Sequence, residues 1–213
     1  MSLLFEPDSV FLQRFLRAGG FYKSDIDGLI GPKSRTALAE FVADSRPIAD
    51  QIGVFDKRTE SSIATMLLPT QRMARKFMKD IASAGLTDGF QVRVISGTRT
   101  YDEQNALYAK GRPNDGPSVT NARGGQSNHN FGIAWDVGIF TSTGTYIDDL
   151  IKKKVMTSKA VDAAYKKIGA YGKSLGLYWG GDWHNPDYPH FQMLDNELLG
   201  TIRDKFVNGG TII

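Results

Sequence analysis

One carboxylate stands inside an otherwise apolar run that follows a glycine-rich loop. Residues 132–140 predict a buried strand, and Asp136 lies in the middle of it. Because an unpaired carboxylate is costly to bury, we expect Asp136 to bind a metal, to pair with a lysine or to cap a turn. His129 lies seven residues earlier, at the end of the loop, where it can share a site with Asp136.

A second segment brings several titratable side chains close together. Residues 179–193 contain His184, His190, Asp182 and Asp187. His190 stands in a short apolar run that predicts a strand. An aromatic-capped core beside an acidic turn would give the same local pattern. Two separate segments that each bring a histidine and an aspartate to a strand nevertheless favour a site.

The composition restricts which metal ligands are available. The 213 residues include no cysteine and three histidines, so a transition metal needs histidine and carboxylate ligands. A catalytic zinc typically takes three such ligands and leaves a fourth position open, and His129, Asp136 and His190 supply that set. Water activated at such a centre needs a general base. Asp187 precedes His190 by three residues and is near enough in the chain to act as one.

An arginine lies where a predicted strand ends and a predicted helix begins. Arg99 follows Ser96 and Gly97 directly after the strand. At that position its guanidinium could bind a carboxylate or stabilise a developing oxyanion, although a surface arginine or a structural salt bridge would give the same pattern. Gln104, in the next helix, is a weaker candidate that we expect to serve packing or to lie on the helix surface.

Helices and strands alternate without a regular βαβ rhythm, which favours an α+β fold over a doubly wound sheet. Hydrophobic residues make up 41% of the chain, which excludes a largely disordered protein. We expect a central, mostly antiparallel sheet and a long loop at 111–128, of a length that is often functional. Periodicity and capping residues predict helices at 8–19, 33–43, 56–66, 70–84, 101–110, 158–175 and 196–207, and strands at 90–95, 132–140 and 189–194.

A proline near residue 69 suggests a division of the chain into two domains. Pro69 disfavours a continuous helix through this point. The pattern predicts a small three-helix domain at 1–68 and a mixed α+β domain at 69–213. With about 68 residues and no disulfide, the first domain has a small core and marginal independent stability.

About two thirds of the chain, residues 69–213, resembles the zinc-dependent M15 peptidase family. That family includes D-alanyl-D-alanine carboxypeptidases and, in its phage endolysin branch, L-alanyl-D-glutamate endopeptidases. The matching residues are Ser127, His129 and Asp136 of a Ser-x-His-x6-Asp pattern, Asp187 and His190 of an acid-x-x-His pair, and the stretches 96–100 and 103–112.

The resemblance implies a role for each matching residue. The histidine–aspartate–histidine set would bind zinc, Asp187 would be the catalytic base, and Arg99 would stabilise the substrate or the transition state. Ser127 would line the substrate site. His184 and Asp182 depart from a clean match, because they offer an alternative ligand and an alternative acid in the second segment.

The N-terminal part resembles the small three-helix peptidoglycan-binding domains over residues 27–41. An ordinary helical appendage would also account for this stretch. The two resemblances together imply a phage endolysin that hydrolyses an amide bond in the peptidoglycan stem peptide, with L-alanyl-D-glutamate as the expected bond. The alternatives are a D-alanyl-D-alanine carboxypeptidase and a non-catalytic wall-binding protein.

Charge and hydropathy exclude some partners and indicate a compartment. The formal net charge of +3 is too small to indicate a nucleic-acid partner. No apolar run is long enough to span a membrane, and the N-terminus lacks the features of a signal peptide. We therefore expect a monomer that accumulates in the host bacterial cytoplasm. By resemblance to endolysins, it would reach the cell wall or periplasm through a separate holin-type permeabiliser.

Overall fold

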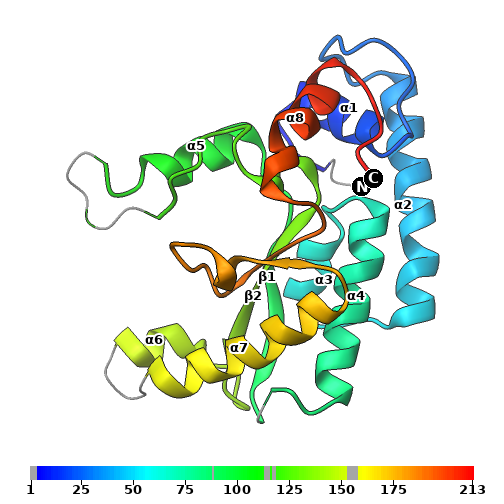
Figure 1. Ribbon diagram of the computed structural model, residues 1–213. Coiled ribbons are helices and arrows are strands. Elements are labelled where there is room, and N and C mark those ends of the chain that lie inside the picture. Colours follow the sequence, from blue (N-terminus) through cyan, green and yellow to red (C-terminus); the bar gives the residue numbers. More distant parts are fainter. Residues whose placement is uncertain (1–3, 88, 113–115, 117–118, 153–157) are drawn as a thin grey trace.

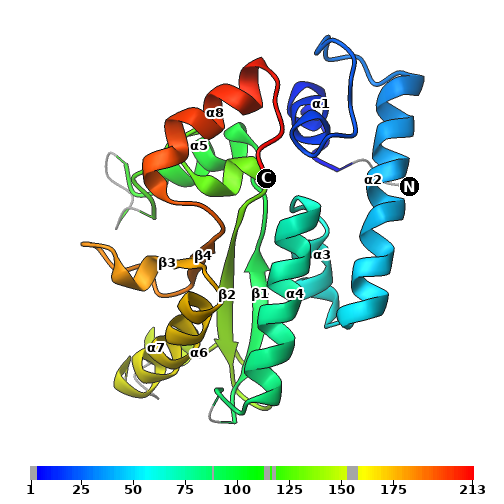
Figure 2. The same cartoon turned by 45° about the vertical axis from the view of Figure 1, so that its right-hand side comes forward.

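The chain folds with α+β architecture, which confirms the expected fold class (Figures 1 and 2). The computed structural model describes residues 4–87, 89–112, 116, 119–152 and 158–213. The helices are α1 (Ser9–Ala18), α2 (Pro32–Ile52), α3 (Lys57–Ile63), α4 (Leu68–Ser83), α5 (Tyr101–Ala109), α6 (Ile147–Lys152), α7 (Ser158–Ser174) and α8 (Leu199–Asn208). The strands are β1 (Gln91–Ser96), β2 (Ala134–Phe140), β3 (Tyr178–Trp179) and β4 (His190–Gln192), and the short 3-10 helices are η1 (Asn128–Phe131), η2 (Gly180–Asp182) and η3 (Asn196–Leu198).

Within the described residues, the four strands form one antiparallel sheet in the order β1-β2-β4-β3. Successive side chains of a strand point to opposite faces of the sheet. On β2, Trp135, Val137 and Ile139 therefore share one face, and all three belong to the larger hydrophobic core. Asp136 lies on the opposite face.

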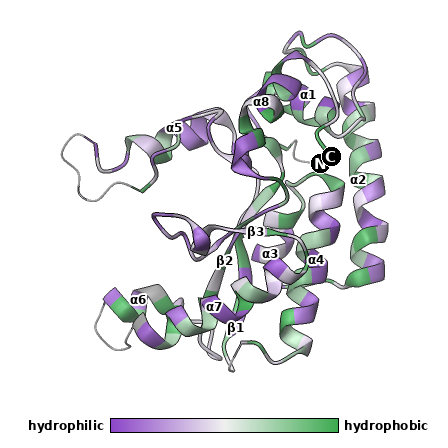
Figure 3. Cartoon of the chain, viewed as in Figure 1, coloured by the Kyte–Doolittle hydropathy of each residue, from purple (hydrophilic) through white to green (hydrophobic). Residues whose placement is uncertain are grey.

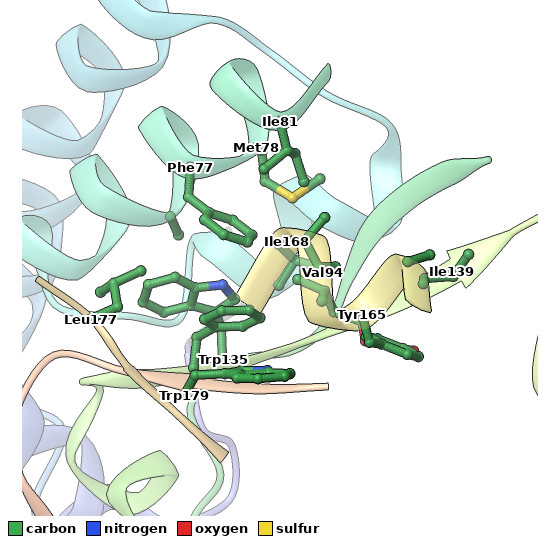
Figure 4. Packing of buried hydrophobic residues seen from close by; sticks show 14 of the residues in the cluster. Phe77, Met78, Ile81, Val94, Trp135, Ile139, Tyr165, Ile168, Leu177 and Trp179 are labelled. Carbon is green, nitrogen blue, oxygen red and sulfur yellow. The ribbon is translucent and has the colours of Figure 1, made fainter. Parts of the chain in front are cut away.

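Helices α4 and α7 supply the packing partners for this apolar face (Figure 4). The Trp135 ring lies against Phe77 of α4 and stacks on Phe191 of β4, with ring centroids 6.1 Å apart in both pairs. Ile168 of α7 is fully buried in the same cluster. Both helices carry hydrophobic and hydrophilic bands in Figure 3, as expected for amphipathic helices. The strongly packed face gives β2 and β4 a rigid base.

A second hydrophobic core joins the N-terminal helices to the end of the chain. Phe206 of α8 packs against Phe11 of α1 and against Phe131 of η1, and Phe15 of α1 belongs to the same cluster. Figure 1 shows α1 and α8 side by side, although they stand at opposite ends of the sequence. Phe131 of this core lies in the same 3-10 helix as His129, so the core supports the segment that carries His129.

Helix α3 covers the outer edge of β1. Strand β1 is an edge strand, so some of its backbone N–H groups have no strand partner. The Thr59 hydroxyl accepts the N–H of Val94 at 3.1 Å, and the Thr65 hydroxyl, just after α3, accepts the N–H of Thr98 at 2.9 Å. Contacts therefore cross residue 68, and the division into domains at that point stays a prediction.

Several elements differ in extent from the sequence-based expectation. Helix α2 continues past residue 43 to Ile52, because its second half packs on α4: Ile48 is buried and Ser45 donates a hydrogen bond to Gln71. Strand β2 begins two residues later than expected, because Gly132 adopts a left-handed turn. Helix α6 and strand β3 were not expected. In the long loop, residues 113–115 and 117–118 lie outside the described residues.

Candidate metal centre

Strand register places an aspartate opposite a histidine on the face of the sheet away from the main core. Asp136 of β2 pairs directly with His190 of β4. Side chains of directly paired residues project from the same face, so the carboxylate and the imidazole meet. On the other side of β2, an irregularity in the register places Ser96 of β1 opposite Asp136 as well.

A turn brings the third residue to this pair. His129 lies in η1, which ends at Gly132 with a φ of 70°. A β-carbon at Gly132 would lie 2.9 Å from Phe15 and 3.0 Å from Leu67, so both the turn and the packing require glycine. The turn reverses the chain between His129 and Asp136, and both side chains then face the same point.

Three potential ligand atoms form a nearly equilateral triangle. His129 Nε2 lies 3.1 Å from Asp136 Oδ1 and 3.2 Å from His190 Nδ1, and His190 Nδ1 lies 3.2 Å from Asp136 Oδ1. Ligands held at about 2.0 Å around a tetrahedral zinc are separated by about 3.3 Å. The triangle therefore fits three ligands of a tetrahedral metal ion. Within the described ranges, this trio is the group of histidine and acidic side chains whose geometry could hold a metal.

Each imidazole is oriented by an acceptor on its outer nitrogen. His129 Nδ1 donates to the carbonyl of Gly97 at 2.7 Å, and His190 Nε2 donates to Gln192 Oε1 at 2.8 Å. With the protons held there, the inner nitrogens of both rings present lone pairs to the centre of the triangle. Two nitrogen lone pairs and a carboxylate oxygen therefore point at one position, and a cation bound there would be stabilised by all three.

The electrostatics of the trio also favour a bound cation. Burial alone would raise the pKa of Asp136, but His129 and His190 hold it well below its usual range. Burial tends to lower the pKa of His190, and the hydrogen bond and charge of Asp136 outweigh it, so the pKa is raised. Burial lowers the pKa of His129. Asp136 therefore stays ionised in the metal-free site, and its negative charge favours the binding of a cation.

Arg99 lies beside the trio and is held by two neighbours. Its Nη1 donates to Asp136 Oδ2 at 3.4 Å and to Ser96 Oγ at 2.8 Å, and its Nε donates to Gln104 Oε1 at 3.0 Å. Gln104 is buried and is itself fixed by a hydrogen bond to the carbonyl of Ala122. Gln104 thus orients Arg99, a role beyond the packing that the sequence indicated.

Asp187 lies on the wall of the cavity that opens at the trio. This cavity, of about 300 Å³, is also lined by Arg99, Ser127, His129 and His190. The Asp187 side chain remains exposed, while partial enclosure by the cavity and the charge of Asp136 raise its pKa. A carboxylate in this position can exchange protons with a molecule in the cavity.

The structure separates the two alternative residues from the trio. Asp182 is exposed and forms an ion pair with Lys173 at 2.8 Å. His184 is exposed and is not among the residues of the candidate metal site. Asp182 and His184 lie in the loop between Gly180 and Asp187. A hydrogen bond from the N–H of Asp187 to the carbonyl of Gly180, 2.9 Å long, closes this loop.

Sequence reasoning missed three residues that shape the site. Gly97 and Gln192 orient the two imidazoles. Asn128 lines the cavity and is buried, and its Oδ1 has no hydrogen-bond partner within the described part of the chain. The alternation of β4 would have placed Gln192 on the same face as His190, two positions away. No local signal indicates the role of Gly97, which depends on a contact between distant segments.

A second cavity lies on the other side of Arg99. It has a volume of about 770 Å³ and lies between α3 and the segment 93–99. Arg99 lines both cavities, so this side chain lies between them.

Comparisons with known proteins place the chain in a family of peptidases. An M15 peptidase family model described as D-alanyl-D-alanine carboxypeptidase matches residues 120–193, which contain the whole trio. The chain is 36% identical over 117 residues to the peptidoglycan L-alanyl-D-glutamate endopeptidase CwlK of Bacillus subtilis, and the match covers 54% of this chain and 68% of that protein. Among solved structures, the L-Ala D-Glu endopeptidase ChiX of Serratia marcescens aligns with a TM-score of 0.40 and 18% identity, over 68% of this chain and 92% of that one.

Proposed function

Since the chain belongs to the M15 peptidase family, we propose that it is a zinc endopeptidase that hydrolyses the L-alanyl-D-glutamate amide bond of the peptidoglycan stem peptide. The observation that carries the proposal is the triangle of His129, Asp136 and His190, with Asp187 beside it on the wall of the same cavity. The donor set of two imidazoles and one carboxylate is typical of catalytic zinc.

The residues around the trio are suited to amide hydrolysis. A bound zinc ion would supply Lewis-acid chemistry, activating water and polarising a carbonyl. Asp187, ionised, accepts a proton from the attacking water and passes it to the leaving amine. Arg99 lies beside the trio and lines its cavity, where its guanidinium stabilises negative charge that develops on the carbonyl oxygen. Gln104 and Ser96 keep this guanidinium in place.

The two cavities favour an endopeptidase over a D-alanyl-D-alanine carboxypeptidase. An endopeptidase must accommodate peptide on both sides of the scissile bond, whereas a carboxypeptidase needs room for only a short terminal segment beyond it. The hollows of about 300 Å³ and 770 Å³ are both lined by Arg99, and we infer that they take the peptide on either side of the bond. A non-catalytic wall-binding protein would have no need of the complete trio with Asp187.

We also propose that the N-terminal helices bind peptidoglycan. A surface hollow of about 470 Å³ lies between the segment 20–24 and α2, and it is lined by the partly exposed Phe21 and by Lys23 and Lys33. An aromatic ring beside hydrogen-bond donors is suited to a glycan or peptide ligand. A full-length Asp187→Ala protein should co-sediment with purified peptidoglycan, and Lys23→Ala with Lys33→Ala should weaken this binding. Unchanged co-sedimentation would count against the hollow as the binding site.

The proposed biological role is that of a phage endolysin. It rests on the resemblance of the stretches 96–100 and 103–112 to that branch of the family. In this role the protein acts from the host cytoplasm as a monomer and reaches the wall after a holin-type protein permeabilises the membrane. No helix in the described ranges is both long and apolar enough to cross a bilayer. Expression alone should be tolerated, and co-expression of a permeabiliser should cause lysis.

The reaction is tested with a short soluble stem peptide. The zinc-loaded protein should split L-Ala from D-Glu, and the two product masses identify the bond. Release of a terminal D-Ala instead would assign the carboxypeptidase activity.

A further inference from the structure

One wall of the larger cavity beside Arg99 is made by α3 and the turn that follows it. Arg58, Ser61, Ser62 and Thr65 line it from this side. Ser61 and Ser62 follow Arg58 by three and four residues and therefore share its face of α3, while Thr65 lies in the turn after the helix. The neighbouring face carries Thr59, which is buried against β1. Helix α3 thus turns its buried side, with Thr59 and Ile63, to the sheet and a side with hydroxyl and cationic groups to the cavity.

The acidic groups of this cavity are already satisfied by hydrogen bonds. Asp56 accepts the backbone N–H groups of Arg58 and Thr59 and the Thr59 hydroxyl. Glu103 accepts the N–H of Thr100 at 2.8 Å as part of a helix cap. Both carboxylates keep their charge, and that of Asp56 also acts on Arg93. The cavity lining carries four cationic side chains, Lys57, Arg58, Arg93 and Arg99, against these two carboxylates, so positive charge is in excess.

The cations of the cavity differ in how firmly they are engaged. Arg93 donates to Gln91 and stacks over the Phe140 ring at 4.7 Å, and Arg99 is held at the trio. The side chain of Arg58, in contrast, makes no hydrogen bond or ion pair with any residue that the structure describes. An unpaired guanidinium that lines a cavity next to a reaction centre is suited to bind an anion of the substrate.

We propose that this cavity binds the free carboxylate of the glutamyl residue next to the scissile amide, and that Arg58 is the residue that recognises it. The inference rests on the proposed function. A glutamyl residue has two carboxyl groups, and the peptide chain continues through only one of them. The other remains as a free carboxylate a few bonds from the scissile amide, unless the substrate is amidated there. Arg99 lines this cavity as well as the cavity at the trio, so the two lie next to each other.

If Arg58 binds this group, the enzyme should prefer a substrate with a free glutamyl carboxylate over one in which the carboxylate is amidated. A carboxylate can accept paired, charge-assisted hydrogen bonds from a guanidinium, whereas a carboxamide offers one oxygen and no charge. The free hydroxyl of Ser62 on the same face of α3 can add a donor. The zinc-loaded protein should therefore cleave the carboxylate form with the higher kcat/KM.

Two soluble peptides that differ only in this group test the inference. One carries D-glutamate with its free carboxylate, and the other carries the corresponding carboxamide. For the wild type, kcat/KM should be higher on the carboxylate peptide. In Arg58→Gln, the ratio of the two kcat/KM values should fall about tenfold, mainly through KM, while Arg58→Lys should keep part of the preference. Arg72→Gln on α4 is the matched control, because it removes an equally exposed arginine away from the cavity.

The outcomes separate this inference from the proposed function. Equal cleavage of both peptides by the wild type, or an unchanged ratio in Arg58→Gln, would overturn the recognition of the carboxylate and leave the endopeptidase activity standing. An equal loss of the ratio in Arg72→Gln would also overturn it, since the effect would then be one of net charge. Cleavage of neither peptide by zinc-loaded wild type would contradict the proposed function itself.

Discussion

Asp136 and His190 are direct neighbours across β2 and β4, and the carboxylate Oδ1 lies 3.2 Å from the imidazole Nδ1. Because strands position side chains more rigidly than loops do, two of the three potential ligands are fixed by backbone pairing. The third, His129, is fixed by its hydrogen bond to Gly97. The site is therefore organised before any metal binds.

Metal content should depend on His190 and not on His184. His190→Ala removes one corner of the ligand triangle, so the purified protein should bind zinc far more weakly. His184→Ala changes an exposed residue outside the trio and should leave about one zinc per chain, as measured by elemental analysis. The opposite ranking would show that the second segment contributes a different ligand.

Asp187→Ala should separate catalysis from metal binding. The variant retains all three ligands and should keep its zinc, but the loss of the general base should lower kcat by ~10²–10⁴-fold. Asp182→Ala, which breaks only the ion pair with Lys173, serves as the matched control and should have a much smaller effect. A larger loss in Asp182→Ala than in Asp187→Ala would transfer the role of base to Asp182.

Zinc affinity should fall as the pH falls. In the metal-free protein, contact with Asp136 raises the pKa of His190 above the ordinary value of about 6.5. Below this raised pKa the imidazole is protonated. This proton competes with the metal, and the apparent affinity therefore decreases as the pH drops through the raised pKa. Competition with a chromophoric chelator between pH 8 and pH 6 measures the effect. An affinity that stays constant over this range would contradict the prediction.

Gly97→Ala should damage both stability and the metal site. A β-carbon at Gly97 would lie 2.3 Å from the carbonyl oxygen of Ser62 and 2.5 Å from the Thr65 hydroxyl, so α3 or the segment that orients His129 must shift. We expect a decrease of about 1–3 kcal/mol in the free energy of unfolding, together with weaker zinc binding.

Gly200→Ala is the control for Gly97→Ala. Gly200 lies in α8 with open space around the position of a new β-carbon, so the change should raise the unfolding free energy by about 1 kcal/mol. Denaturant unfolding and zinc titration of both variants provide the measurements. Equal stability of the two variants would show that α3 does not support the Gly97 segment.

The sequence contained much of the candidate site. Asp136 stood out because it is a carboxylate in an apolar strand, and His190 because it is a histidine in another. The structure confirms the α+β class and the antiparallel sheet, and it brings the predicted trio together. The roles of His129, Asp136 and His190 as zinc ligands and of Asp187 as base stay predictions that the variants above test.

Other features depend on contacts between distant segments, and local patterns do not contain them. The hydroxyls of Thr59 and Thr65 look like ordinary helix residues in the sequence, yet they complete the edge of β1. The second half of α2 is stabilised by α4, so its extension past residue 43 follows from packing. Arg58 likewise gains its position beside the cavity only when α3 docks on the sheet.

The central claim is tested most directly by digestion of purified peptidoglycan, with mass analysis of the soluble products. The zinc-loaded protein should release fragments with new L-Ala carboxyl ends and new D-Glu amino ends. A chelator should abolish their release, and added zinc should restore it. Release of free D-Ala without these new ends, or undiminished digestion after verified removal of the metal, would contradict the account.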